Sequence, residues 1–258
     1  MKNIDLNCDM GESVGAWTMG MDVNVIPYVT SANIACGYHA GDAHVMFKTV
    51  KLAKEHGVGL GAHPGYPDLV GFGRRNMDCT PEEVRDYVIY QIGAMKAFCA
   101  IHGVSLQHVK PHGSLYNMSV GNEPLIRAIV EAIAGVDRSV IYLALGGAQA
   151  PLVTKIAREA GIRVAFEAFP DRAYTPEGKL APRSLPGAVI KDPKVAAERA
   201  LRMAKEGKII TTDGSVLEMQ IDTICVHGDN PSAVELVKNI RSAIEGEGIT
   251  VAPMGTFI

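Results

Sequence analysis

The sequence predicts an α/β protein of one domain, residues 1–258, in which seven parallel strands close into a β/α barrel. Short β-branched or apolar runs alternate with amphipathic helical segments along the chain, which is typical of parallel sheets with helical crossovers. About seven such units follow one another without a linker, which favours a closed barrel. An open doubly wound sheet is the alternative fold. Polar and glycine residues cluster after the predicted strands, as in folds that bind ligands at the carboxyl ends of their strands.

The strands are predicted from short runs of β-branched and apolar residues. They span residues 4–8, 32–36, 58–62, 108–110, 140–145, 163–166 and 223–226. Residues 249–253 are a candidate for an eighth strand. The polar clusters that follow the strands are at 7–12, 37–42, 61–66, 110–113, 146–147, 167–172 and 227–229.

Amphipathic helices are predicted between the strands, over residues 42–56, 80–102, 123–134, 151–160, 193–206 and 231–245. The helix over 80–102 has the clearest start, because Thr80 is followed by Pro81 and by Glu83, a favourable capping sequence. Gly103 is expected to end it. Two connections, residues 9–30 and 169–189, are long; they are either lids or binding loops, or rigid surface excursions.

Composition excludes several classes of protein. The net charge of −3 and the pI near 6.2 argue against a nucleic-acid partner, which requires a clustered basic excess. No apolar run approaches the ~20 residues of a membrane span. The first predicted strand leaves no room for a signal peptide, and five cysteines without C-x-x-C spacing favour reduced thiols. We therefore expect a cytoplasmic protein.

The polar side chains at the strand ends are the candidates for chemistry. Asp5, Asn7 and Asp9 alternate along the first strand and so share a face, either as a binding site or as a hydrogen-bond network. Glu12 follows at a turn and can reach the same crevice. Four histidines lie at or just past strand ends: His39, His63, His112 and His227. Imidazole serves as a general base, a proton shuttle or a metal ligand near neutral pH.

Lys110 ends the fourth strand, directly before Pro111 and His112. Its ammonium can stabilise an oxyanion or a carboxylate, or the amine can form a Schiff base if its pKa is lowered. We favour the electrostatic role. We expect Lys110→Met to reduce turnover strongly and to leave stability almost unchanged.

A bound metal is left open by the sequence. Two or three of the histidines could form a site with Asp9 or Asp42, but their spacings match no short zinc motif. Nucleotide motifs are also missing, since there is no phosphate-binding G-x-x-x-x-G-K-[ST] loop. Residues 57–62 fit G-x-G-x-x-A but lead from a helix into a strand, the reverse of the required order. Gly146 and Gly147 form a better, though weak, anion-binding turn.

Several blocks of the sequence resemble the LamB/YcsF family. They are residues 5–12 (DLNCDMGE), 32–42 (ANIACGYHAGD), 61–68 (GAHPGYPD), 71–75 (GFGRR), 109–117 (VKPHGSLYN), 169–174 (FPDRAY), 182–183 (PR) and 225–229 (CVHGD). The resemblance covers nearly the whole chain. It implies a seven-stranded β/α barrel like that of polysaccharide deacetylases, whose Asp/His metal motifs this chain lacks.

The resemblance also implies an activity, namely the opening of 5-oxo-L-proline to L-glutamate with ATP hydrolysis. ATP, with Mg²⁺, is then the expected cofactor, and subunits B and C of a 5-oxoprolinase are the expected partners. Homo-oligomers are compatible with this assignment. We assign catalytic roles to Asp9, Glu12, His39, His63, Lys110 and His112. We assign substrate binding to Asn7, Asn33, Arg172, Arg183, His227 and Asp229.

Two other functions remain compatible with the sequence. One is a metal-dependent deacetylase or amidohydrolase that acts alone. Stoichiometric binding of zinc and turnover without ATP would support this function. The other is a non-catalytic subunit that presents the substrate to its partners, for which substrate binding and complex activity would survive Asp9→Asn and His112→Ala.

Overall fold

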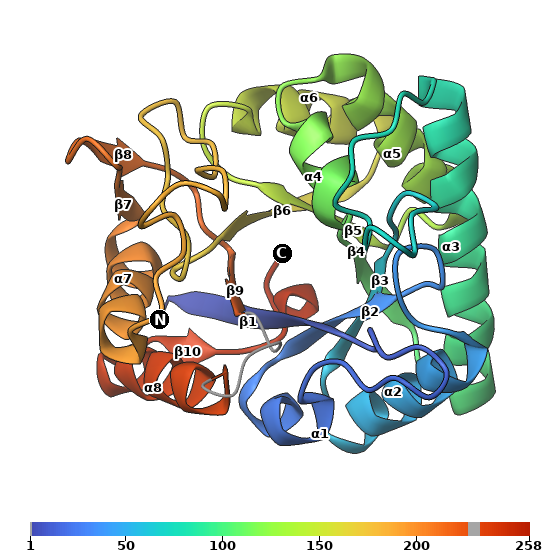
Figure 1. The fold of residues 1–258 in the computed structure, drawn as a ribbon, viewed down its shortest axis with the longest axis horizontal. Helices are drawn as coiled ribbons and strands as arrows, with labels where there is room; N and C mark the ends of the chain where they lie inside the picture. The colour runs from blue at the N-terminus through green and yellow to red at the C-terminus, as the bar shows by residue number, and fades with distance from the viewer. Residues whose placement is uncertain (1, 227–232) are drawn as a thin grey trace.

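The computed structural model describes residues 2–226 and 233–258, in which seven parallel strands close into a barrel (Figure 1). The barrel strands are β1 (Asn3–Met10), β2 (Ser31–Ala35), β3 (Gly59–His63), β4 (Leu106–Val109), β5 (Ile141–Leu145), β6 (Arg163–Ala168) and β9 (Thr223–Val226). Strands β1 to β6 pair in sequence order, and β9 pairs with both β6 and β1, which closes the ring. The predicted α/β barrel is confirmed.

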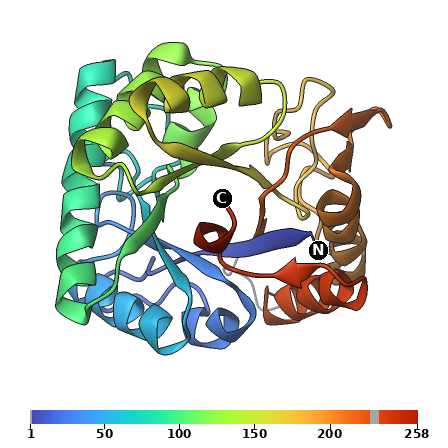
Figure 2. The same ribbon diagram turned by 180° about the vertical axis from the view of Figure 1, so that it is seen from behind.

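Helices surround the barrel on its outer side (Figures 1 and 2). The helices of this outer layer are α2 (Ala43–Glu55), α3 (Pro81–His102), α5 (Glu123–Val136), α6 (Ala150–Ala160), α7 (Pro193–Glu206) and α8 (Ala233–Gly246). The short helices of the chain are α1 (Asp22–Val25), α4 (Gly113–Ser119), η1 (Ile26–Tyr28) and η2 (Met254–Thr256). Helix α3 has the predicted capping box between Thr80 and Glu83 and ends at Gly103, which is left-handed. No helix in the described parts of the chain has the length and apolarity of a membrane span.

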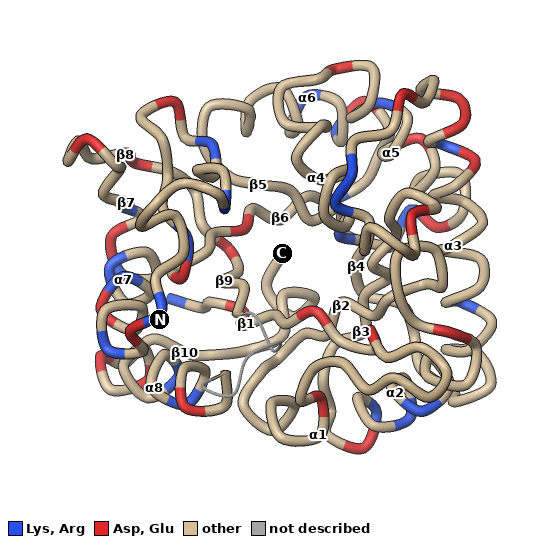
Figure 3. The backbone as a smooth tube through the Cα atoms, in the orientation of Figure 1, with Lys and Arg blue, Asp and Glu red and all other residues tan. Residues whose placement is uncertain are grey.

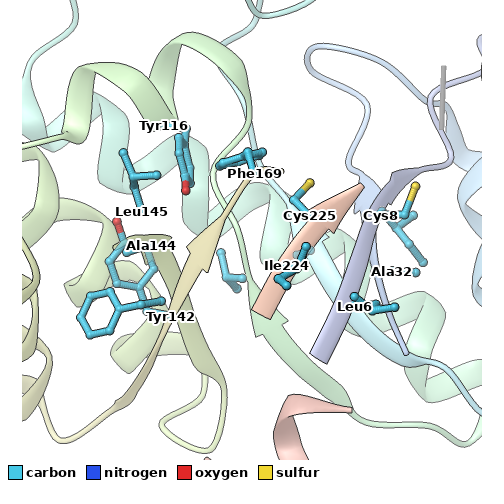
Figure 4. Packing of buried hydrophobic residues seen from close by; sticks show 14 of the residues in the cluster. Leu6, Cys8, Ala32, Tyr116, Tyr142, Ala144, Leu145, Phe169, Ile224 and Cys225 are labelled. Carbon is cyan, nitrogen blue, oxygen red and sulfur yellow. The ribbon is translucent and has the colours of Figure 1, made fainter. Parts of the chain in front are cut away.

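The side chains of β1 alternate between two environments. Leu6 and Cys8 face outward and belong to the apolar core between the strands and the helices, as Ile224 of the neighbouring β9 does (Figure 4). Asp5 and Asn7 face inward, where both are fully buried and hydrogen-bonded to Thr223 of β9. The period of two in a strand therefore separates an apolar core from a largely polar barrel interior.

The C-terminal segment closes the amino-terminal end of the barrel (Figure 2). Met254 in η2 is fully buried against Ile141 and Leu143 of β5 and Ala165 of β6. Its backbone N–H donates to Asp5 Oδ1 at 3.2 Å. The opposite end of the barrel, where the strands have their carboxyl ends, is left for ligands.

Two short elements differ from the sequence prediction. Strands β7 (Lys208–Ile210) and β8 (Val216–Glu218) form a separate antiparallel hairpin outside the parallel barrel, which the sequence analysis did not predict. The turn contains Asp213 and Gly214, a turn signal that was overlooked. The candidate eighth strand is β10 (Thr250–Val251), which pairs in parallel with the start of β1 outside the closed ring.

Candidate active site

Lys110 lies at the centre of the carboxyl-terminal end of the barrel. Only 3% of its side chain is exposed, and its Nζ is 3.0 Å from Asp9 Oδ1 and 2.9 Å from Glu167 Oε1. The ammonium also donates to Asn7 Oδ1 at 3.3 Å and contacts Cys225 Sγ at 3.1 Å. Three barrel strands, β1, β6 and β9, thus hold one buried cation from three sides.

The charge state of Lys110 follows from these neighbours. Burial alone would lower the pKa of Lys110, but the surrounding negative charges, that of Asp9 above all, raise this pKa well above its usual value. A protonated amine is no nucleophile, so the Schiff-base alternative is disfavoured and the electrostatic role is favoured.

A layer of buried amides and hydroxyls lies beneath Lys110 and fixes Asp9. Asn33 Nδ2 donates to Asn7 Oδ1 at 2.7 Å and to Asp9 Oδ1 at 2.8 Å. Asn33 Oδ1 in turn contacts His108 Nε2 at 2.6 Å, and that ring occupies the space in front of Gly61, where a Cβ would clash with it. Burial lowers the pKa of His108 to about 3, so the ring is neutral and hydrogen-bonds without adding charge.

Three histidines and a glutamate form a second group beside Asp9. His63 Nε2 is 3.3 Å from Asp9 Oδ2 and 3.0 Å from His112 Nδ1. The His39 ring stacks on the His112 ring, with centroids 3.6 Å apart. Glu12 Oε1 lies 3.8 Å from His39 Nε2 and 4.0 Å from His112 Nδ1. Donor atoms of Glu12, His39, His63 and His112 all lie within 4.8 Å of one another, so among the described residues these four form a group that could hold a metal.

Backbone carbonyls orient two of these rings. His63 Nδ1 is 2.7 Å from the carbonyl oxygen of Lys110, and His112 Nε2 is 2.9 Å from that of Phe72. Phe72 has a φ of 54°, which is unusual for a bulky residue and marks strain at a functional site. Next to it, Gly73 leaves no room for a Cβ, which would come within 2.8 Å of both His39 and His112.

Burial keeps two histidines of this group, His39 and His112, neutral. It lowers the pKa of His112 to about 3, with a further contribution from His63, and lowers the pKa of His39 well below its usual value. Neutral imidazoles can accept a proton or bind a metal.

A cavity of about 650 Å³ opens above these two groups. Asp9, His63, Lys110 and His112 line its buried part, while the exposed Arg74, Lys179 and Arg183 line its outer part. Blue backbone segments border the barrel opening in Figure 3. The excess of cations over carboxylates in the lining favours an anionic ligand.

The structure brings the six residues assigned to catalysis together, although Glu12 and His39 are not among the residues that line the cavity. Of those assigned to substrate binding, Arg172 and Arg183 line it. Asn7 and Asn33 are fully buried below it, where Asn33 hydrogen-bonds to Asp9 and Asn7 to Lys110, and their role in substrate binding stays a prediction. His227 and Asp229 lie outside the described residues.

Arg172 has a second, structural task. Its guanidinium donates to the carbonyl oxygens of Ala181 at 2.6 Å and Ala188 at 3.3 Å, which ties together the long segment after β6. That segment supplies Phe169, Arg172 and residues 179–183 to the cavity. Of the two interpretations of residues 169–189, the geometry favours a binding loop.

Three residues that the structure places in the site were not selected from the sequence. Glu167 was part of a polar cluster, but only the fold reveals that it pairs with Lys110. Tyr116 in α4 donates to Glu167 Oε2 at 3.0 Å, and Arg74 lines the cavity with its guanidinium over the Phe72 ring. The GFGRR block and the residues after Lys110 were signals that could have pointed to Arg74 and Tyr116.

Comparisons with known proteins show which family the chain resembles. The sequence model of the LamB/YcsF family matches residues 4–258. The A subunit of the 5-oxoprolinase of Pyrococcus furiosus is 56% identical over 255 residues, which cover 99% of each chain. The protein of the same name from Natranaerobius thermophilus is 53% identical over 257 residues, covering 100% of this chain and 99% of its own.

Two solved structures are similar to the chain in fold. A lactam utilization protein from Thermus thermophilus superposes with a TM-score of 0.90 and 48% identity, covering 98% of this chain and 99% of its own. A GH113 β-1,4-mannanase superposes with a TM-score of 0.51 and only 11% identity, covering 95% of this chain and 99% of its own, which is a likeness of fold alone. On the full-length family match and the identity to its relatives, the chain belongs to the LamB/YcsF family.

Proposed function

We propose that this chain acts as the A subunit of a 5-oxoprolinase, which opens the lactam of 5-oxo-L-proline to L-glutamate with ATP hydrolysis, together with subunits B and C. Curated relatives of this name match the chain over its full length at 47–56% identity. The observation that carries the proposal is the buried Lys110 ammonium, which Asp9 and Glu167 hold at the floor of a cation-lined cavity.

The chemistry of a lactam explains why such a site is needed. The amide is stabilised by resonance, so hydrolysis near neutral pH is coupled to ATP. Transfer of the γ-phosphoryl group to the lactam oxygen makes the ring carbon electrophilic. Water adds to that carbon, the ring C–N bond breaks, and the nitrogen takes up a proton. A second water then releases the phosphate and leaves the carboxylate of glutamate.

The residues of the cavity have separate roles in this sequence. Asp9 Oδ2, 3.3 Å from His63 Nε2, accepts the proton of the attacking water. Lys110 stabilises the negative oxygen on the ring carbon, since its charge is fixed in advance by Asp9 and Glu167. Arg183 or Arg172 binds the carboxylate of the substrate, for which a guanidinium has matching geometry.

The nucleotide, as Mg²⁺–ATP, is assigned to the outer part of the cavity. The exposed side chains of Arg74, Lys179 and Arg183 supply positive charge there, which suits phosphate groups. Since the chain has no phosphate-binding loop motif, we assign the remainder of the nucleotide site to one of the partners. All five cysteines are free, in agreement with the reducing, ATP-containing cytoplasm as its compartment.

The test is turnover by the reconstituted complex that carries a variant in which one carboxylate oxygen of Asp9 is replaced by an amide nitrogen. Asp9→Asn keeps the size of the side chain and removes the base, so kcat should fall by ~10²- to 10⁴-fold. The matched control is Asp86→Asn on the exposed face of α3, which should keep wild-type turnover. Glutamate and phosphate are measured at saturating substrate; an Asp9→Asn complex within a few-fold of wild type would refute the assignment.

One observation favours a second candidate, a hydrolase that acts alone. The Glu12, His39, His63 and His112 group has the composition of a metal-dependent amidohydrolase site. Hydrolysis of an N-acyl substrate or of 5-oxoproline by the isolated chain, without ATP and with a metal, would support this candidate. Turnover that requires both ATP and the partners would exclude it.

A further inference from the structure

Two ring nitrogens of the histidine group, His63 Nε2 and His112 Nδ1, face each other. A carbonyl oxygen only accepts hydrogen bonds, so His63 Nδ1 and His112 Nε2, which face the carbonyls of Lys110 and Phe72, must carry the protons. With one proton on each ring, the lone pairs lie on His63 Nε2 and His112 Nδ1, and these two atoms are only 3.0 Å apart. Two acceptors at this distance repel each other unless a positive charge lies close to both.

Further acceptors converge on the same place. Asp9 Oδ2 is 3.3 Å from His63 Nε2, and Glu12 Oε1 is 4.0 Å from His112 Nδ1. His39 is fully buried, and neither of its ring nitrogens has a hydrogen-bond partner among the described residues. Its Nε2 lies 3.8 Å from Glu12 Oε1. A buried polar group without a partner costs about 1–3 kcal/mol, so a ligand that satisfies it is expected.

We propose that His63 Nε2, His112 Nδ1 and Glu12 Oε1, with His39 Nε2 as the fourth donor within reach, bind a divalent first-row transition-metal cation. Two nitrogens that each lie about 2.1 Å from one ion are roughly 3.0–3.4 Å apart, which agrees with the 3.0 Å between His63 and His112. A ligand histidine normally donates its other N–H to a carbonyl or carboxylate, as both rings do here.

A shared proton is the competing explanation for the short distance. It would join His63 to His112 but would leave both nitrogens of His39 without a partner. A cation serves all three rings and the carboxylate together. The nitrogen-rich donor set selects an ion such as Zn²⁺ or Co²⁺ over Mg²⁺, which prefers oxygen, so this site is separate from the Mg²⁺ of a nucleotide. It would bind its cation whether or not the proposed lactam reaction takes place.

The experiment uses the full chain after treatment with a chelator. Titration with Co²⁺ should give visible absorption bands of nitrogen-ligated cobalt that saturate at one ion per chain. Zn²⁺ should abolish these bands, and a large excess of Mg²⁺ should not. Calorimetry with Zn²⁺ should show the same stoichiometry. A spectrum that stays that of aqueous cobalt would overturn the proposal and leave the shared proton as the explanation.

Variants locate the ion. His63→Gln and His112→Gln should each weaken Zn²⁺ binding by at least ~100-fold, because each removes one ligand. The control is His44→Gln on the exposed face of α2, which should bind as wild type does. Wild-type affinity in both site variants would overturn the proposal, because the ion would then lie elsewhere. Should a variant fail to fold, the cobalt spectrum of the wild-type chain still decides.

Discussion

At the scale of single residues, Lys110, to which we assign a catalytic role, is also a buried part of the fold. The sequence placed it on a rim, where loss of its charge would leave stability almost unchanged. The structure places it in the interior, 3% exposed, against the carboxylates of Asp9 and Glu167. The charges of a buried pair are costly to leave unpaired, so this burial argues against the expectation of unchanged stability.

We now predict that Lys110→Met lowers the free energy of unfolding as well as turnover. Removal of one partner from a buried ion pair typically costs about 3–5 kcal/mol, because the remaining charge stays buried without compensation. Urea unfolding of the two proteins at pH 7 measures this difference. The matched control is Lys51→Met on the exposed face of α2, which should stay within about 0.5 kcal/mol of wild type. Equal loss in both variants would contradict the buried pairing.

Asp5 gives a prediction for pH. Burial raises its pKa from 3.8 to about 6, against the hydrogen bonds from Ser31, Thr223 and Thr30. The folded protein therefore holds this proton more tightly than the unfolded chain does. The resulting stability is fully present below pH 3.8 and is lost as the pH rises through about 6. This rise in the pKa of Asp5 corresponds to about 3 kcal/mol of free energy of unfolding.

Unfolding of wild type and Asp5→Asn between pH 4 and pH 8 tests this. The free-energy difference between the two proteins should shift by up to about 3 kcal/mol in favour of the variant as the pH rises. His39, His108 and His112, whose pKa values are lowered, act in the opposite direction, so only the difference between the proteins isolates Asp5. A pH-independent difference would show that Asp5 is ionised in the folded protein throughout.

At the scale of elements, local signals in the sequence predicted the helices and barrel strands well. Helix α3 starts after Thr80 and ends before Gly103 as predicted, because both signals act within one turn of the chain. The hairpin of β7 and β8 was missed because its strands are only three residues long and lack a clear alternation. The closure of the barrel by η2 was also missed, since it depends on contacts with distant strands.

The closure by η2 gives a prediction for Met254. This side chain is fully buried against β5 and β6, and its replacement by alanine leaves a cavity there. Met254→Ala should lower the free energy of unfolding by about 2–5 kcal/mol, measured with urea. The control Met19→Ala removes a methionine that is 43% exposed and should cost much less. Comparable losses in both variants would show that η2 does not support the barrel.

At the scale of the whole molecule, the fold explains why only part of the site was predictable. Strand ends were visible in the sequence, and parallel strands place their ends on one side, so Asp9, His63, Lys110 and His112 could be expected to lie near one another. Which of these side chains pair with which partners could not be read from the sequence, because the pairing depends on closure of the barrel. Glu167 meets Lys110 across the interior only when β9 joins β6 to β1.

The whole molecule also predicts dependence on partners. The chain supplies a cavity with a buried ammonium and exposed cations, and it has no phosphate-binding loop motif for the nucleotide. Phosphoryl transfer requires the phosphates and the lactam to be held in line, and groups that are poorly positioned lose most of the rate. The isolated chain with ATP and Mg²⁺ should therefore form glutamate from 5-oxoproline ~100-fold or more slowly than the complex with subunits B and C.

Asp9→Asn separates assembly from catalysis in the same assay. Asp9 is only partly exposed at the cavity floor, so the variant should assemble with both partners as wild type does, as judged by size-exclusion chromatography. The assembled variant should then remain inactive, which would locate the chemistry in this chain. Full turnover by the assembled variant would make the chain a presenter of substrate, and robust ATP-coupled glutamate formation by the isolated wild-type chain would show that the cavity alone completes the nucleotide site.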